Sequence, residues 1–539
     1  SGIWVVDISD HLPVFTVLPN TAQKVIIKRK SVPRFFSVEN LNKFRYELGM
    51  HDWSVLDTLT DVNSMYNKFI SDFQYLYDKY FPVQIKTLKT SESNKPWITK
   101  AIKNSVAKKN NFYKNHLKSR TDKSESKYKT YKNKLTSVLR KAEKEYYWEK
   151  LNNVRNNLSK TWKILNSLIS RTQTKGTVDE IIVNNKIVRD PKIIADNFNS
   201  FFANVGPNLA AKIPKSSQPF TDHLHFSTSE SVFFKPTDEI EVKLVINSLK
   251  NSYSKGHDNC AVNTVKNCMN QLSAPLCKIF NKSMQDGVVP DDLKIAKIIP
   301  VYKSDDKKTI SNYRPISVLP AFSKILERLV YNRLLDFINK HELLSDSQYG
   351  FRQKISTSMA LIDLVDQISM SMENKKYTIG IFLDLAKAFD TVNHNILLKK
   401  LFQYGVRGTS QSWFKSYLTN RQQYVSINGI NSHKLAITCG VPQGSILGPL
   451  LFILYINDLN SVSKLVSFIM FADDTNIFIS GSSLRDLTSI LNSELEVVSD
   501  WFCANLLSLN IKKTKYILFG NKKVCDVPIF INQEQITRV

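Results

Sequence analysis

Two adjacent aspartates, Asp473 and Asp474, lie between two short apolar runs, FIMFA and NIFI, within residues 466–480. These runs have the composition of buried strands, so the pattern predicts a hairpin that carries both carboxylates at its tip. Turns usually recruit glycine or asparagine, whereas two neighbouring carboxylates repel each other unless a cation compensates them. An acidic surface turn would explain an isolated pair of aspartates. The flanking strands favour a metal-binding hairpin instead.

A third acid, Asp384, follows the apolar run of residues 377–383. A carboxylate at the end of a buried strand is costly unless it binds a metal or is paired. We therefore expect Asp384 to converge with the hairpin, although about 90 residues separate them. Three carboxylates would supply the hard oxygen ligands that suit two Mg²⁺ ions, with Mn²⁺ as a substitute. Two such ions promote in-line phosphoryl displacement.

Two further segments carry residues suited to nucleotide chemistry. The string CGVPQGSILGPLLF contains three glycines, Gly440, Gly444 and Gly448, which permit close backbone approach to a ligand ahead of an apolar helix. Farther upstream, Lys303 and Arg314 flank a polar loop between two apolar runs. A finger-like hairpin of this kind could present both cations to a triphosphate.

The charge of the chain indicates a polyanionic partner. Its 74 lysines and arginines exceed its 48 aspartates and glutamates by 26. Residues 100–150 hold sixteen basic against five acidic residues, interleaved with aromatic side chains on a helical stripe. A solvated charged face is the simpler interpretation, but this density favours contact with the phosphates of an RNA. Arg352, after QYGF, is a candidate clamp for the template backbone.

Neither a membrane span nor a disulfide framework is expected. The longest apolar run, residues 446–456, falls short of the ~20 residues that a span requires. The six cysteines are scattered without a CxxC pair, which is typical of reduced thiols. We therefore expect a cytoplasmic and nuclear protein of undetermined oligomeric state.

Four strings occur in the order FLDLAKAFDTV, VPQGSILGPLLF, FADDTNIF and LSLNIKKTKYILF. Together they resemble the consecutive palm motifs of reverse transcriptases, and most closely those of non-LTR retrotransposons of the jockey type. The resemblance implies an α/β (α+β) right-hand polymerase with fingers and palm, preceded by a mainly helical basic region. RNA-dependent RNA polymerases, which usually carry GDD, are a weaker match, as are intron maturases and telomerase-like polymerases.

The resemblance implies RNA-templated DNA synthesis. The 3′-hydroxyl of a DNA primer, in this family the nicked target DNA, would attack the α-phosphate of a dNTP on an RNA template. Asp384 and Asp473 would bind both metal ions together with the carbonyl of Leu385, and Asp474 would complete the acidic triad. Lys513 would protonate the departing pyrophosphate, with Lys512 an equal chemical candidate. The alternative is a truncated, inactive nucleic-acid-binding remnant.

The resemblance also assigns the residues around the nucleotide. Phe389 would lie beneath the sugar and exclude a 2′-hydroxyl by its bulk, so that the product is DNA. Gln443 and Gly444 would line the nucleotide pocket. Lys303 and Arg314 would hold the triphosphate.

The start of the chain has a resemblance of its own. The string SDHLPVF matches the last strand and loop of metal-dependent endonucleases of the apurinic type. His11 would be the catalytic histidine of such a domain and Asp10 its assistant. The acidic ligands of that domain would lie upstream of this sequence, so we expect a remnant without nuclease activity.

These features predict five segments. We expect the chain to be a fragment cut at both ends, and to stop before the primer grip and the thumb of the polymerase. The five segments are an endonuclease remnant (residues 1–20), a connecting region (21–99), a basic helical nucleic-acid-binding region (100–175), a helical linker region (176–280), and the fingers and palm (281–539).

Overall fold

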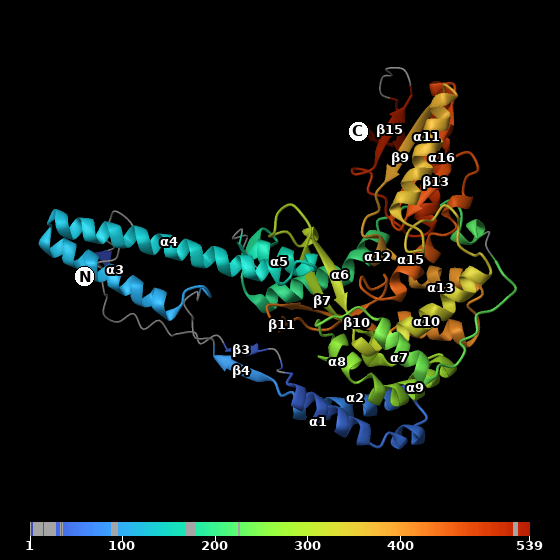
Figure 1. Cartoon of the computed structure of the whole chain (residues 1–539). Coiled ribbons are helices and arrows are strands. Elements are labelled where there is room, and N and C mark those ends of the chain that lie inside the picture. The colour runs from blue at the N-terminus through green and yellow to red at the C-terminus, as the bar shows by residue number, and fades with distance from the viewer. Residues whose placement is uncertain are drawn as a thin grey trace. The chain divides into compact units, whose positions relative to one another are not determined.

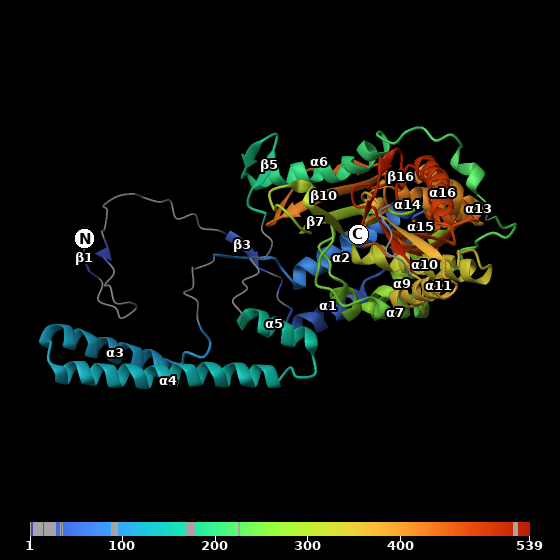
Figure 2. The same cartoon turned by 90° about the horizontal axis from the view of Figure 1, so that it is seen from above.

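A computed structural model describes most of the chain, shown in Figures 1 and 2. The described residues are 2–3, 14–15, 29–32, 34, 36–87, 95–168, 178–224, 227–520 and 527–539. Asp10 and His11, the predicted endonuclease residues, lie outside this set. The chain divides into two compact units, Ser1–Phe36 with Phe81–Lys175, and Ser37–Tyr80 with Gly176–Val539.

The first unit is dominated by a helical hairpin of α3 (Lys100–Ser119) and α4 (Asp122–Asn152), which run side by side in both views (Figures 1 and 2). The hydroxyls of Thr99 and Thr121 cap the two helices, and Arg120 between them has a left-handed backbone. The predicted helical basic region is therefore confirmed. The same unit contains α5 (Leu158–Leu168) and the strand pairs β1 (Gly2–Ile3) with β2 (Val14–Phe15) and β3 (Arg29–Val32) with β4 (Gln84–Thr87).

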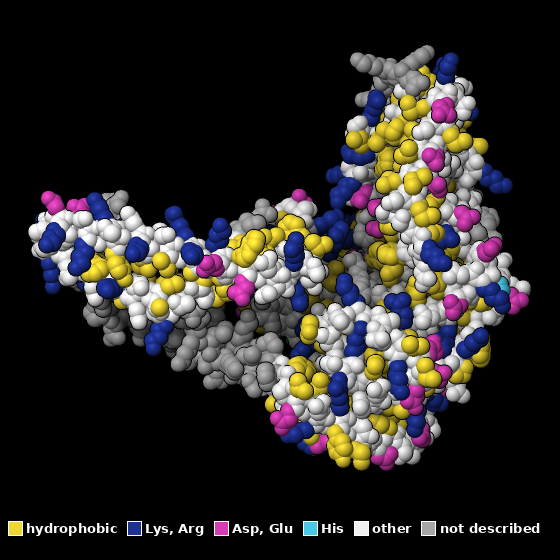
Figure 3. Space-filling view, in the orientation of Figure 1, with side chains coloured by type: hydrophobic (Ala, Val, Ile, Leu, Met, Phe, Trp, Pro, Cys, Tyr) yellow, Lys and Arg dark blue, Asp and Glu magenta, His cyan; other side chains and the backbone are white. Residues whose placement is uncertain are grey.

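Aromatic side chains hold the hairpin together. The rings of Phe112 and Tyr131 lie 5.1 Å apart, and those of Tyr113 and Tyr128 are also 5.1 Å apart. Lysines lie over several of these rings, for example Lys127 over Phe112. Most other lysines of the two helices are exposed, and Figure 3 shows basic side chains along this surface.

The second unit contains a five-stranded sheet that we call the first sheet, in the order β13-β14-β9-β15-β18. Its strands are β13 (Ser467–Phe471), β14 (Asp474–Gly481), β9 (Tyr377–Leu383), β15 (Lys515–Phe519) and β18 (Thr537–Arg538). Ile379 and Ile381 of β9 are completely buried on one face. Because side chains alternate along a strand, Phe382 and Asp384 belong to the other face. There, Ala360 of α11 (Thr357–Glu373) packs with Ile469 and Phe478.

The other sheet of this unit, the second sheet, has the order β11-β10-β7-β8, with β12 also paired to β10. Its strands are β7 (Ile295–Tyr302), β8 (Tyr313–Val318), β10 (Arg421–Ile427), β11 (Ile430–Asn431) and β12 (Leu435–Ile437). Phe198 and Phe202 of α6 (Pro191–Ala210) share one buried cluster with Ile298 and Val425 of this sheet. Residues near 200 thus contribute to the core that packs against the second sheet.

The buried residues of α2 (Val62–Tyr80) recur at helical spacing along one face of the helix. The ring of Phe69 meets Phe322 of α10 (Ala321–Lys340) at 5.2 Å, edge to face. Residues 37–80 therefore belong to the second unit, because their apolar face is buried there, rather than to a connecting region. The remaining elements of this unit are α1 (Val38–Met50), α7 (Glu239–Ser248), α8 (Val262–Asn267), α9 (Met269–Asp286), α12 (Ala388–Thr391), α13 (His394–Gln403), α14 (Thr409–Leu418), α15 (Leu447–Tyr455), α16 (Leu484–Ala504), β5 (Ile181–Val183), β6 (Lys186–Val188), β16 (Phe530–Ile531) and β17 (Glu534–Gln535).

No helix within the described ranges combines the length and the apolar character that crossing a bilayer demands.

Candidate active site

Strand register brings two of the predicted carboxylates together. In the antiparallel pair of β14 and β9, Thr475 is opposite Leu383, so the next positions beyond the end of the ladder are Asp474 and Asp384. Strands β13 and β14 form the predicted hairpin, with Phe471 opposite Asp474. The two-residue turn is therefore Ala472 and Asp473, and Asp474 begins the returning strand instead of sharing the tip.

Gln348 stabilises this turn by a hydrogen bond, and its sequence pattern did not predict that role. Its completely buried side-chain oxygen accepts hydrogen bonds from the backbone N–H of Ala472 (3.0 Å) and of Gly350 (2.7 Å). Ala472 needs this support because its φ of 58° is left-handed, a strained conformation for alanine. A β-carbon on Gly350 would stand 2.2 Å from the Ala472 nitrogen, so the glycine permits the contact.

Asp384 is held by the segment that matches the LSLNIKKTKYILF motif. The side-chain amide of Asn510 donates to Asp384 Oδ2 at 2.8 Å, and the Asn510 backbone N–H donates to the Asp384 carbonyl at 2.8 Å. Next to it, Leu385 pairs with Leu509 in an isolated β-bridge. These contacts fix the orientation of the Asp384 carboxylate. The sequence feature that could have predicted them is the asparagine within the LSLNIKKTKYILF motif.

The carboxyl group of Asp474 is affected by the charges of the other two aspartates. Partial burial of the Asp474 carboxyl raises its pKa, and the negative charges of Asp473 and Asp384 raise that pKa further. Asp384 and Asp474 also line one cavity of about 480 Å³. Lys513 lines this cavity as well, whereas Lys512 is not among its lining residues. The geometry therefore distinguishes two lysines that were equivalent in sequence.

The carboxylates do not form a ready metal cage. Within the described ranges, no three His, Cys, Asp or Glu side chains are close enough together to hold a metal ion. The donor chemistry fits Mg²⁺, since Asp384 and Asp474 offer hard oxygens on one cavity. Mutual repulsion disfavours closer approach of the side chains without a cation. The strands thus bring the backbones of Asp384 and Asp474 together as expected. Among the described residues, the carboxylate oxygens are not close enough together to form a metal site.

Two glycines of residues 440–444, which we call the VPQG loop, allow this loop to pack closely against other backbone segments of the protein. A β-carbon on Gly440 would meet the backbone of Asp390 at 2.9 Å, and one on Gly444 would meet the Ser317 carbonyl oxygen at 2.5 Å. Both glycines have positive φ, 83° and 123°. The contact at Gly444 brings the backbone of this loop against β8. Gly444 does not line the cavity beside the loop.

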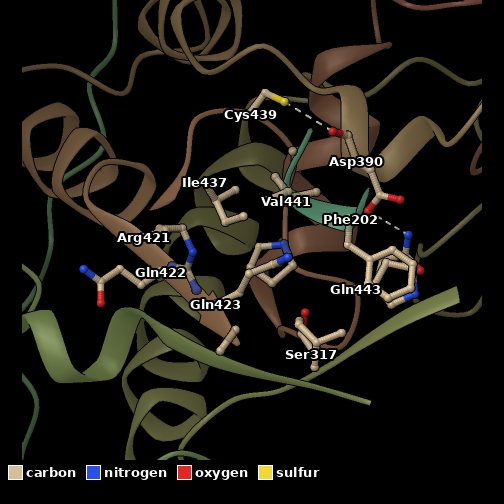
Figure 4. A pocket seen from close by; sticks show the side chains of 16 residues that line it. Phe202, Ser317, Asp390, Arg421, Gln422, Gln423, Ile437, Cys439, Val441 and Gln443 are labelled. Carbon is tan, nitrogen blue, oxygen red and sulfur yellow. Dashed lines mark hydrogen bonds between the residues drawn. The ribbon is translucent and has the colours of Figure 1, made fainter. Parts of the chain in front are cut away.

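Gln443 lies beside that cavity, of about 50 Å³, shown in Figure 4. Its side-chain amide donates to Asp390 Oδ1 at 3.0 Å. Burial raises the pKa of Asp390 to about 6. The other oxygen of Asp390 has no hydrogen-bond partner in the described part of the chain. Asp390 therefore fixes the orientation of Gln443, the predicted pocket residue.

Phe389 lies in an aromatic stack. Its ring is stacked on Phe452 of α15 with centroids 4.6 Å apart, and it meets Phe351 edge to face at 6.2 Å. The Phe389 carbonyl accepts a hydrogen bond from Val441 in the VPQG loop. The stacked contact with Phe452 and the edge contact with Phe351 restrict the rotamers of this ring, as a steric barrier to a sugar hydroxyl requires.

Lys303 and Arg314 lie at the end of the β7–β8 pair that the connecting loop joins, where Val301 is opposite Arg314. Both side chains are exposed. Arg352 has a different environment, because its guanidinium donates to the carbonyls of Ser345 (3.0 Å) and Gln348 (3.1 Å). Arg352 thus supports the loop under the carboxylate turn as well as being a predicted template contact.

This arrangement of strands, acids and glycine loop agrees with a comparison to protein families. Residues 303–537 match the family model described as reverse transcriptase (RNA-dependent DNA polymerase). Residues 303–537 form a reverse transcriptase domain. The predicted mixed fold with a polymerase domain is confirmed, and the domain contains all four recognised motifs.

Several curated proteins similar to this chain come from fruit fly mobile elements. The chain is 33% identical over 295 residues to the "RNA-directed DNA polymerase from mobile element jockey" of Drosophila melanogaster, which covers 52% of this chain and 32% of that protein. It is 31% identical over 333 residues to the "Probable RNA-directed DNA polymerase from transposon BS" of the same species, covering 59% and 36%. The chain thus spans about a third of the length of these relatives.

Proposed function

We propose that the chain is an RNA-directed DNA polymerase of a non-LTR retrotransposon. The observation that carries this proposal is the register of β9 and β14, which sets Asp384 beside Asp474 on one cavity with Lys513. The reaction joins the 3′-hydroxyl of a DNA primer to the α-phosphate of a dNTP on an RNA template and releases pyrophosphate. Its test is primer extension with dNTPs on an RNA template. Because target DNA serves as primer, we expect activity in the nucleus after synthesis in the cytoplasm.

The residues divide the chemical work. Asp384, Asp473 and the Leu385 carbonyl would hold two Mg²⁺ ions, which when bound would supply activation of the attacking hydroxyl and charge stabilisation at the leaving oxygen. Asn510 holds the Asp384 carboxylate in one orientation through its 2.8 Å hydrogen bond. Lys513, on the same cavity, gives a proton to the departing pyrophosphate. Lys303 and Arg314 neutralise the triphosphate.

Replacing Phe389 with alanine should relax the choice of sugar. Without the ring, the 2′-hydroxyl of a ribonucleotide meets no barrier, so the ratio of kcat/KM for rNTP to that for dNTP should rise about 10- to 100-fold. The measurement is single-nucleotide primer extension with matched rNTP and dNTP. Phe402→Ala, a partly exposed phenylalanine of α13, is the control and should leave the ratio unchanged. A ratio unchanged in Phe389→Ala would remove this role from Phe389.

We further propose that the α3–α4 hairpin binds the template RNA through phosphate contacts. The exposed lysines Lys114, Lys134 and Lys144 lie on its two helices. Replacing all three by alanine should lower the slope of log affinity against log salt by about 2, since each lost contact to single-stranded RNA contributes roughly 0.7. RNA binding measured by anisotropy between low and high salt gives this slope.

The matched control removes the same charge elsewhere. Lys43, Lys68 and Lys79 of the second unit are each paired with a carboxylate, at 2.7, 3.0 and 2.8 Å. Replacing these three by alanine should leave the salt slope within error of the parent chain. Equal slopes for both triple variants would show that the hairpin has no special part in RNA binding.

A further inference from the structure

Lys387 occupies an unusual position three residues after Asp384. Its backbone φ of 55° is left-handed, which costs a non-glycine residue about 1 kcal/mol or more. The residue precedes α12 and its side chain is half-buried. The ammonium lies within 3.4 Å of the Ser311 carbonyl oxygen and 3.3 Å of the Tyr313 carbonyl oxygen. The strained backbone thus directs this side chain to the β7–β8 loop.

Both of these carbonyl groups adjoin the residues expected to hold a triphosphate. Tyr313 directly precedes Arg314 in β8. The backbone N–H of Lys303 donates to the Asn312 carbonyl, between the two acceptors of Lys387, at 2.9 Å. The Lys387 ammonium therefore lies at the base of the loop that carries Lys303 and Arg314. An ammonium group has three N–H donors, so two carbonyl contacts leave one for a ligand.

The charges around Lys387 are mainly of the same sign. Burial lowers the pKa of its ammonium, and the positive charges of Lys303, Arg314 and Lys513 lower it further, against the opposing charge of Asp390. The repulsion between the Lys387 ammonium and these three cations would be relieved by an anion bound next to Lys387. Lys513 also lines the cavity of Asp384 and Asp474, which links this group of cations to the proposed reaction centre.

We propose that Lys387 is a substrate-binding residue that contacts the phosphate chain of the incoming nucleotide and completes, with Lys303 and Arg314, a polyphosphate site that spans the second sheet and the Asp384 loop. The inference rests on the proposed function for the identity of the nucleotide. A structural role alone would tie residues 311–313 to the loop after β9. That role needs the two carbonyl contacts but not the surrounding cations.

Replacing Lys387 with methionine tests the proposal, because methionine keeps the apolar stem and removes the charge. Isothermal titration of the full chain with inorganic tripolyphosphate should show about 10- to 100-fold weaker binding, the loss expected for one hydrogen bond to a charged group. The KM for dNTP in primer extension should rise by a similar factor, with kcat less affected. Lys387→Arg should retain tripolyphosphate binding, which guards against a folding defect in the methionine variant.

Lys297 provides the control. This lysine of β7 is also half-buried, and burial alone lowers the pKa of its ammonium. Lys297→Met should bind tripolyphosphate like the parent chain. Parent-like binding in Lys387→Met, or an equal loss in Lys297→Met, would overturn the proposal. If the parent chain binds tripolyphosphate through Lys387 but extends no primer, the polyphosphate site stands and the proposed polymerase function fails.

Discussion

Replacing Lys400 with methionine should lower the free energy of unfolding of the second unit by about 3–5 kcal/mol, because it leaves the Asp458 carboxylate buried without its partner. The Lys400 ammonium and Asp458 Oδ1 are 2.6 Å apart, and neither side chain has any exposed surface. The ammonium also donates to the Tyr455 carbonyl at 2.6 Å, and Trp501 donates to the other Asp458 oxygen at 3.4 Å. This ion pair therefore joins α13 and α16 to the end of α15, the helix after the VPQG loop.

Urea denaturation followed by tryptophan fluorescence measures the loss, since Trp501 is completely buried beside the pair. The double variant Lys400→Met with Asp458→Leu should recover much of the stability, because an apolar pair removes the unpaired charge. The partly exposed pair Lys282 and Asp286 is the control, and Lys282→Met should change stability by less than about 1 kcal/mol. A loss below that value in Lys400→Met would contradict the account of a buried, interdependent pair.

Replacing Asp384 with asparagine should reduce primer extension by about 10³-fold or more, because the charge that stabilises the transition state is lost. The fold should survive, since an asparagine oxygen can still accept the hydrogen bond from Asn510. Steady-state extension on an RNA template measures the rate, and a denaturation curve confirms that the variant is folded.

Asp366→Asn is the matched control for this substitution. Asp366 is an exposed residue of α11, so its change should leave the rate within about twofold of the parent chain. Asn510→Ala should give an intermediate loss, because Asp384 keeps its charge and loses the side chain that orients it. A full rate in Asp384→Asn would place the chemistry elsewhere.

The sequence predicted the elements that carry strong local patterns. The apolar alternation before Asp384 predicted β9, and the runs around Asp473 and Asp474 predicted the hairpin. It also predicted which of these segments meet, since a buried carboxylate needs a partner or a cation. The order of the four motifs predicted a reverse transcriptase domain, in agreement with the family match of residues 303–537.

Contacts between segments far apart in the chain were not predictable in this way. The pairing of Asn510 with Asp384 crosses 126 residues and has no periodic signature. Nothing in the sequence distinguishes Gln348 from other polar residues. In the structure, its side-chain oxygen accepts a hydrogen bond from the backbone N–H of Ala472, 124 residues away. Lys387 stands in a recognised motif, but only the fold shows that it reaches the β7–β8 loop.

The VPQG glycines show a second limit. Sequence suggests that a glycine allows close approach, but it does not say to what. In this fold the neighbours are the backbones of Asp390 and Ser317.

The most direct test of the central claim is extension of a DNA primer on an RNA template by this chain, with dNTPs and Mg²⁺, while RNA binding is measured in parallel. The account predicts DNA products that disappear when EDTA removes the metal or when Asp473 is replaced by asparagine, with RNA binding unchanged in both cases. Equal incorporation in the parent chain and in Asp473→Asn would contradict it. So would RNA binding without extension by the parent chain in either Mg²⁺ or Mn²⁺, which is the behaviour of an inactive binding remnant.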